Sequence, residues 1–166
     1  MTDQNDQTPV QQPAADVNAP SVTPQGVYIK DCSFEAPSGP FIGGIEGQPQ
    51  VNMTMRAGNS VLGQDAYEVV LNLRLEAKGG DKVVWLCELQ QAGAFVVKNL
   101  GSADLMQVLN VMAPNYLLSF ARSTVAELVT KGGFPPFLLP LVTFEGLQAR
   151  RAQQAQQADA APTTVN

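Results

Sequence analysis

Hydrophobic and polar residues alternate most regularly between residues 67 and 77. Every second side chain there is apolar, which is the pattern of a β-strand with one buried face and one polar face. Residues 51–56 alternate in the same way, and the runs at 28–36 and 83–97 have a strand-like composition. Together the four segments predict an antiparallel sheet, with a hairpin turn at 78–81. The apolar positions of the most regular strand are Val69, Leu71, Leu73, Leu75 and Ala77.

The apolar spacing becomes helical after residue 101. Ser102 is placed to cap a first helix, which Pro114 is expected to break or kink because proline lacks a backbone N–H. A longer helix follows and is expected to end at Gly132-Gly133. Three prolines within 134–142 are incompatible with a regular helix, so this segment is predicted to be an extended apolar connector.

Strands in the first half followed by helices in the second half predict an α+β domain. The segment 37–49 is too long and too rich in glycine and proline for a tight hairpin, and we expect it to be a crossover loop after the first strand. Thr143 is placed to cap a last helix that begins near Phe144. The expected organisation is a disordered tail at 1–26, one folded domain at 27–150 and a flexible tail at 151–166.

The composition narrows the classes of function. The chain carries 15 acidic and 10 basic residues, and its net charge of −5 disfavours nucleic-acid and membrane-surface partners. It contains no histidine, which is the commonest general base and metal ligand, and no glycine-rich phosphate loop. We therefore expect the chain to be no enzyme and to use no cofactor and no metal.

The two cysteines and the N-terminal residues bear on the compartment. Cys32 and Cys87 lack the spacing of metal ligands, and both are expected to be reduced, small core residues. The N-terminus lacks the basic and apolar regions of a signal peptide, and no run of about 18 apolar residues is present to span a bilayer. These features predict a cytoplasmic protein that does not insert into membranes.

Apolar residues are unusually frequent in two segments that are expected to be irregular. Phe41, Ile42 and Ile45 lie in the crossover loop, and the connector at 134–142 is almost wholly apolar. Loops usually run over the surface, so these side chains either seal the core or line a groove, and the residues alone leave both readings open. A groove would suit extended, non-native polypeptides; the alternative is a module that binds a hydrophobic small molecule or lipid.

Acidic residues share one face of the expected sheet. Asp31 and Glu35 lie four positions apart on the first strand, about 13 Å from each other on the same face. Glu88 on the fourth strand is expected to join them, which would make this face flat and acidic. Ordinary solubility accounts for such a face unless a partner recognises it. A catalytic pair of carboxylates, the third possibility, would need acids that converge in one cleft.

Five segments resemble the SecB family of protein-export chaperones in order and spacing, over about residues 27–147. They are YIKDCSFEAP (28–37), YEVVLNLRLEA (67–77), WLCELQQAGAF (85–95), APNYLLSFAR (113–122) and KGGFPPFLLPLVTF (131–144). One departure is Gly47, which stands where the family usually has a tryptophan. The resemblance implies a four-stranded antiparallel sheet with helices on one side, assembled as a homotetramer that is a dimer of dimers. It also implies an ATP-independent chaperone that holds unfolded precursors and delivers them to the translocation ATPase SecA.

The resemblance also assigns roles to residues. It places the basic, zinc-binding C-terminal tail of SecA on Asp31, Glu35, Leu86 and Glu88. It places Cys87, Leu89 and Gln91 near subunit interfaces. The expected substrate groove comprises Phe41, Ile42, Ile45, Met53, Met55, Leu141, Phe144 and Leu147.

Overall fold

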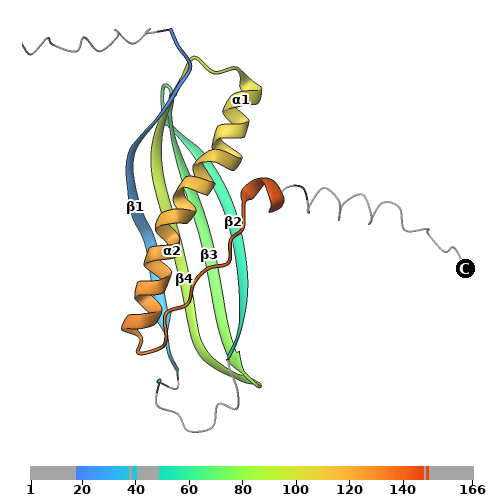
Figure 1. Ribbon diagram of the computed structural model, residues 1–166. Helices are drawn as coiled ribbons and strands as arrows, with labels where there is room; N and C mark the ends of the chain where they lie inside the picture. Colours follow the sequence, from blue (N-terminus) through green and yellow to red (C-terminus); the bar gives the residue numbers. More distant parts are fainter. Residues whose placement is uncertain (1–17, 38, 41–48, 148, 150–166) are drawn as a thin grey trace, which may run out of the picture.

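The computed structural model describes residues 18–37, 39–40, 49–147 and 149. Four long strands form one antiparallel sheet in the order β1-β4-β3-β2 (Figure 1). β1 and β2 lie at opposite edges and are therefore not joined by a hairpin, which agrees with the predicted crossover; most of the segment between them, at 41–48, lies outside the described residues. The strands are β1 (Ser21–Glu35), β2 (Gln50–Gly63), β3 (Ala66–Gly79) and β4 (Lys82–Lys98).

The hairpins agree with the sequence pattern. Gly79 pairs with Lys82, so Gly80 and Asp81 form a two-residue turn, and Gly80 has the positive φ of 60° that such turns favour. The turn between β2 and β3 contains Asp65, also with a positive φ, of 58°. Both turns are therefore tight, and the three strands β2, β3 and β4 follow one another as neighbours in the sheet.

β1 begins at Ser21, seven residues before the predicted strand and inside the range assigned to the N-terminal tail. Two register shifts interrupt its pairing with β4, between Pro24 and Gly26 and between Ile29 and Asp31. Each shift inserts an extra residue and resets the alternation of side chains. Because β1 is also an edge strand with mostly exposed side chains, its first half carries no apolar alternation that the sequence analysis could detect.

The helical region is continuous from residue 102 to 131. It consists of α1 (Ser102–Gln107), the π-helical segment η1 (Val108–Met112) and α2 (Ala113–Lys131). Of the break or kink predicted at Pro114, the break does not occur, because the π-turn before the proline changes the hydrogen-bond spacing. The N–H of Ala113 donates to the carbonyl of Val108, five residues earlier. The predicted cap was also wrong, since Gly101 is the N-cap and Ser102 is the first helical residue.

α2 ends where its two glycines predicted. Gly132 caps the helix, and Gly133 has a φ of 85° that an L side chain rarely adopts. The Phe134 N–H then donates to the Val129 carbonyl over 3.2 Å and turns the chain back. Residues 134–143 run without regular structure to a last helical turn at 144–147, as expected. Thr143 caps this turn, because its Oγ1 accepts a 3.3 Å hydrogen bond from the Gly146 N–H.

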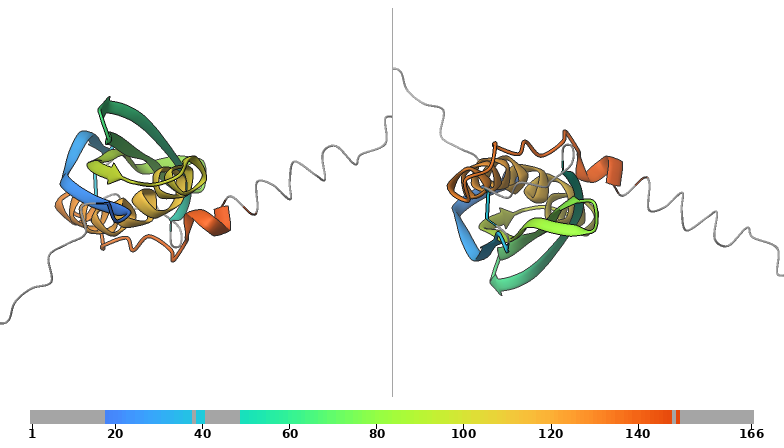
Figure 2. Two further views of the ribbon diagram at one scale, coloured as in Figure 1. Left: turned by 90° about the horizontal axis from the view of Figure 1, so that it is seen from above. Right: turned by 90° about the horizontal axis from the view of Figure 1, so that it is seen from below.

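Helix and connector cover one face of the sheet, and no other described element covers the opposite face. Figure 2 shows α2 and the extended connector on the same side of the sheet, which confirms the expected layers. The α2 face of β3 contributes fully buried Leu71 and Leu75, and α2 contributes Leu117, Val125 and Val129. We call the bare side the open face. The register places on it Asp31, Ser33, Glu35, Asn52, Thr54, Arg56, Glu68, Asn72, Arg74, Glu76, Leu86, Glu88 and Gln90.

Candidate functional site

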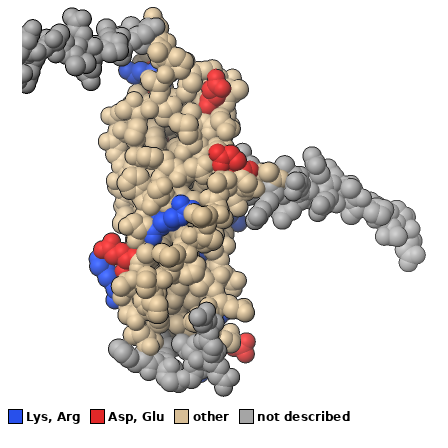
Figure 3. All heavy atoms as spheres, in the orientation of Figure 1, with Lys and Arg blue, Asp and Glu red and all other residues tan. Residues whose placement is uncertain are grey.

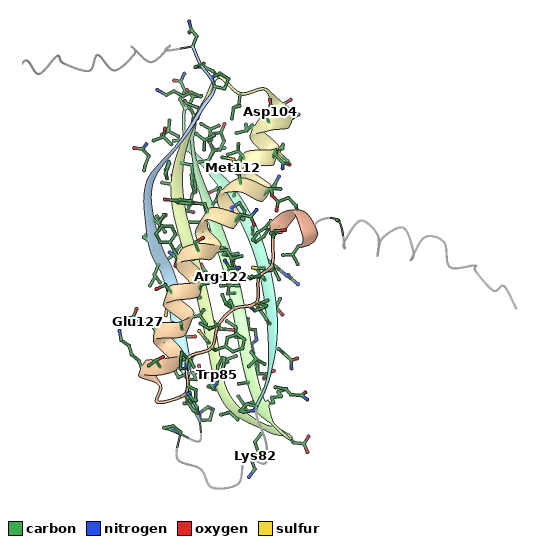
Figure 4. All side chains as sticks on the ribbon, in the orientation of Figure 1. Lys82, Trp85, Asp104, Met112, Arg122 and Glu127 are labelled. Atoms are coloured by element: carbon green, nitrogen blue, oxygen red, sulfur yellow. The ribbon has the colours of Figure 1, made fainter. Side chains whose placement is uncertain are left out.

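Four aromatic side chains from three segments gather at the end of the sheet away from α1. Phe34 of β1 stacks on Trp85 of β4, with ring centroids 6.1 Å apart and an interplanar angle of 26°. Phe137 of the connector meets Trp85 edge-on at 5.9 Å, and Phe134 lies 6.4 Å from Phe34. Figure 4 shows Trp85 beside the connector. The connector is thus fixed to the sheet by aromatic contacts.

Beside these rings lies an apolar hollow of about 270 Å³, which we call the aromatic pocket. Its walls come from the start of β2, from Trp85 and from the first half of the connector. The two prolines in its rim keep the connector extended, so its backbone cannot coil into a helix over the opening. The residues that line it are Pro49, Val51, Trp85, Phe134, Pro135, Pro136 and Phe137.

Gly132 allows this arrangement, since a Cβ atom at that position would lie only 2.2 Å from the Phe34 ring. No side chain larger than hydrogen fits unless the ring moves. The glycine that ends α2 therefore also makes room for the aromatic contact between β1 and β4.

A second hollow of about 190 Å³, the connector hollow, lies at the far end of the connector. It is lined by Leu141, Val142, Thr143, Gly146 and Leu147. The Leu141 side chain is 94% exposed, which is unusual for a leucine in a folded domain.

Polar contacts from α2 hold this part of the chain in place. Asn115 Oδ1 accepts a 2.9 Å hydrogen bond from the Phe144 N–H, and its Nδ2 donates to Glu145 over 2.9 Å. This donation is the main reason why the pKa of Glu145 lies below its usual value. Arg122 donates to the Pro140 carbonyl over 3.3 Å. Together with the aromatic contacts of Phe134 and Phe137, these bonds hold the connector at both of its ends.

The predicted groove residues fall into three groups. Phe41, Ile42 and Ile45 lie outside the described residues. Met55 and Phe144 belong to the core, with 8% and 6% of their surface exposed, and Met53 packs beside them half-buried. Leu141 and Leu147 line the connector hollow.

Sequence reasoning left Phe134 and Phe137 open, as part of a connector that either seals the core or lines a groove, and it did not consider Trp85 or Phe34 for the groove. The signal for two of them was present, because Phe134 and Phe137 flank the adjacent prolines of a segment that no helix or strand could bury. The other two lie on regular strands at positions that look like ordinary core.

The open face carries the four residues assigned to SecA binding. Glu35 lies opposite Leu86 in the register, and Ser33 lies opposite Glu88, so the expected common face of β1 and β4 is observed. Asp31 lies one row further along, opposite Gln90. Their role in binding stays a prediction, whereas their shared face is a feature of the structure.

This face is neither flat nor purely acidic, contrary to the expectation. Arg74 of β3 forms an ion pair with Glu88, and Lys78 pairs with Glu76 over 3.1 Å. The reason is that β2 and β3 also point basic side chains to this side. A polar hollow of about 290 Å³ is lined by Asp31, Thr54, Arg56, Asn72, Leu73, Arg74, Glu88, Leu89 and Gln90.

A buried carboxylate ties β1 to the rest of the open face. Glu68 is 8% exposed; it accepts hydrogen bonds from the Tyr28 hydroxyl and, over 2.6 Å, from the Lys30 ammonium. The Lys30 bond and then the Tyr28 bond lower the pKa of Glu68. Because Tyr28 and Lys30 lie on β1 and Glu68 lies on β3, these bonds span β4 and brace the edge strand.

Cys87, Leu89 and Gln91 lie beneath α2, not on the surface. All three are buried, and Gln91 donates to the Tyr28 carbonyl over 2.9 Å and accepts from Thr124 of α2 over 3.4 Å. They are covered by their own chain and so cannot touch another subunit directly in this conformation; the interface role stays a prediction. The expectation that both cysteines are core residues was wrong for Cys32, which is exposed on the edge strand β1.

The outer side of the helical layer is apolar near its start. Met112, Tyr116 and Phe120 are exposed there, and Met112 and Tyr116 line a hollow of about 150 Å³ together with Val22, Pro24 and Phe95 of the sheet. Figure 3 shows that the side bearing α2 and the connector carries few charged residues. Among the described residues, no helix is long and apolar enough to span a membrane.

The family model described as "Preprotein translocase subunit SecB" matches residues 15–155. The chain belongs to the SecB family. One relative is the protein-export protein SecB of Pseudomonas fluorescens, which is 39% identical, with 95% of this chain and 96% of that protein covered. Another is the protein-export protein SecB of Nitrosococcus oceani. The latter is 44% identical, with 82% of this chain and 85% of that protein covered. Members are chaperones, so the chain is a holding chaperone for protein export and not an enzyme.

A solved structure agrees on the fold. A SecB-like chaperone from Mycobacterium tuberculosis, in complex with a ChAD peptide from the HigA1 antitoxin, superposes with a TM-score of 0.63. The alignment covers 74% of this chain and 91% of the other at 12% identity. At this identity the likeness concerns the SecB fold alone.

Proposed function

We propose that this SecB-family chain holds unfolded precursor polypeptides in the aromatic pocket and the connector hollow, and passes them to SecA through the open face. The observation that carries the proposal is the pair of hollows at the two ends of one extended connector, the first walled by aromatic rings and the second bordered by the exposed Leu141. A client in extended conformation fits such a track better than a compact ligand does. The process takes place in the cytoplasm and uses no ATP.

The physical basis of holding is apolar burial without sequence recognition. Burial of apolar surface stabilises by about 25 cal/mol per Å² and needs no particular orientation of the groups. The aromatic pocket offers ring faces and edges to any apolar side chain, and none of the described residues that line it carries a charged side chain. Each pocket is small, so a single contact is weak and exchangeable.

Several weak contacts act together if the chain assembles as a homotetramer, a dimer of dimers. The apolar helical surface around Met112, Tyr116 and Phe120 supports an assembly contact, because a monomer would leave these side chains in water. Four copies of both hollows let one long client bind at several places, so avidity sets the holding time. The expected mass is about 71 kDa, four times that of the 17.7 kDa chain.

Handover requires a second surface, because no nucleotide drives release. The open face lies on the opposite side of the sheet from both hollows, so SecA can bind there while a client is held. Asp31, Glu35 and Glu88 attract the basic C-terminal tail of SecA, and Leu86 gives it an apolar contact.

The experiment measures how far the chain suppresses the aggregation of a denatured precursor, with and without SecA. The expected result is suppression at about one tetramer per client, followed by transfer to SecA. Glu88→Lys should retain suppression and lose the transfer. If the chain suppresses no aggregation but retains a small hydrophobic molecule on purification, the ligand-binding alternative replaces this proposal.

A further inference from the structure

The polar hollow on the open face has opposite charges at its two ends. One row of the register reads Asp31 on β1, Gln90 on β4, Asn72 on β3 and Arg56 on β2. The row crosses all four strands, and all four side chains line the same hollow. Strands lie about 4.8 Å apart, so the acid and the base are separated by about 14 Å.

Neither end of the row is neutralised by another of the described side chains. The Arg56 guanidinium forms no hydrogen bond and no ion pair with the described residues, and its side chain is exposed. Asp31 accepts only the adjacent backbone N–H of Cys32, over 2.8 Å. In the neighbouring row, by contrast, Arg74 and Glu88 pair with each other. Among the described rows of the open face, this one alone combines an unpaired acid with an unpaired base.

The middle of the row is neutral and can form hydrogen bonds. Gln90 and Asn72 supply amide donors and acceptors between the two charges, and Thr54 adds a hydroxyl group at the β2 side. Such groups suit the backbone of a peptide laid across the strands. Since an extended peptide advances about 3.3 Å per residue, two of its side chains about four residues apart would reach both ends.

We propose that the open face recognises a partner segment of mixed charge, with a basic side chain over Asp31 and a carboxylate over Arg56. This inference rests on the proposed docking of SecA to the open face and specifies the chemistry of the docking segment. A purely basic segment would satisfy Asp31, Glu35 and Glu88 but would place positive charge near Arg56. The carboxylate fixes the register of the segment across the sheet, which an acidic patch alone does not do.

The test is the affinity of SecA for the chain with Arg56 replaced. Arg56→Glu should weaken SecA binding about fivefold and Arg56→Gln about twofold, in keeping with exposed ion pairs. If the partner segment is purely basic, Arg56→Glu should instead bind SecA more tightly than the wild-type chain does. Lys98→Glu is the matched control, because it makes the same change of charge on β4 about 26 Å from Gln90.

The outcomes separate this inference from the proposed function. If SecA binds the wild-type chain and Glu88→Lys weakens it, but Arg56→Glu binds equally or more tightly, the mixed-charge segment is wrong and the docking face stands. If Lys98→Glu weakens SecA binding as much as Arg56→Glu does, the loss of affinity comes from the change in net charge, and the inference also fails. If SecA does not bind the wild-type chain, both fail.

A second measurement tests the carboxylate directly. Synthetic peptides that copy the docking tail of SecA are compared with the same peptides in which every Asp and Glu is replaced by its amide. The native peptide should bind Arg56→Gln about twofold more weakly than wild type, whereas the amide peptide should bind both chains equally. Equal losses with both peptides would overturn the proposal.

Discussion

Phe34 stacks on Trp85 from the neighbouring strand, although the two residues are 51 positions apart in the chain. The contact joins the edge strand β1 to β4 and forms the base against which the connector packs. Phe137 reaches Trp85 and Phe134 reaches Phe34, so four aromatic rings determine the position of the connector. The proposed client site is thus built on the covered face of the sheet and closed by a segment without regular structure.

Replacement of Phe137 by serine should weaken binding of an unfolded client about tenfold, because the pocket loses an aromatic wall worth about 1–2 kcal/mol. The measurement is fluorescence anisotropy of a labelled, denatured precursor. Leu138→Ser is the control, since Leu138 is the next residue, is 78% exposed and does not line the aromatic pocket. Equal loss in both variants would argue against the pocket as the client site.

Gly132→Ala should lower the free energy of unfolding by about 1–3 kcal/mol, because the new methyl group would overlap the Phe34 ring. Urea unfolding measures the change. Gly58→Ala is the matched control on β2, where a Cβ atom would meet no other atom within 4 Å. The same loss in both variants would mean that backbone freedom, and not the contact with Phe34, decides the effect.

The strands and helices were predictable wherever one face is buried and the alternation is uninterrupted. β3 satisfies both conditions, and its five apolar positions all lie in the core. The glycine pair after α2 and the Thr143 cap were also predictable, because each feature depends on local backbone chemistry. The shared face of Asp31, Glu35 and Glu88 followed from the period of two.

Other features depend on contacts that the sequence pattern does not contain. The two register shifts in β1 remove the regular alternation by which its first half could have been recognised. The π-turn before Pro114 keeps the helix unbroken, where a break or a kink was expected. The aromatic pocket needs β1, β4 and the connector side by side, and only the fold brings them together. The basic side chains of β2 and β3 changed the acidic face because the strand order places them beside Glu88.

The two thiols should react at very different rates. Cys32 is exposed, so a thiol reagent at about pH 8 should modify it quickly. Burial raises the pKa of the Cys87 thiol from 9.0 to about 11, so Cys87 should react only when the protein unfolds. Thiol titration with and without denaturant should count one and then two groups. Rapid modification of Cys87 in the folded protein would contradict the packing of α2 over β4.

The same pKa shift predicts a loss of stability at high pH. Between pH 9.0 and about 11 the unfolded chain releases the Cys87 proton while the folded chain retains it. The free energy of unfolding therefore falls as pH rises through this window. Cys87→Ala should remove this part of the dependence, which urea unfolding at several pH values would show. An unchanged profile in the variant would exclude Cys87 as the source.

Asn115→Ala should loosen the last helical turn, because Phe144 loses its acceptor and Glu145 loses its donor. We expect faster amide exchange at 144–147 and a loss of about 1 kcal/mol in stability. The pKa of Glu145 should rise toward its ordinary value, which NMR titration would detect. Ser119→Ala, one turn further along α2 and exposed, should change none of these quantities.

The central claim is that clients and SecA bind opposite faces of one sheet. The most direct test places a photo-crosslinking amino acid at position 137 in one variant and at position 88 in another. With a denatured precursor and SecA both present, we predict crosslinks to the precursor from position 137 and to SecA from position 88. Crosslinks to the precursor from position 88 with none from position 137 would contradict the account.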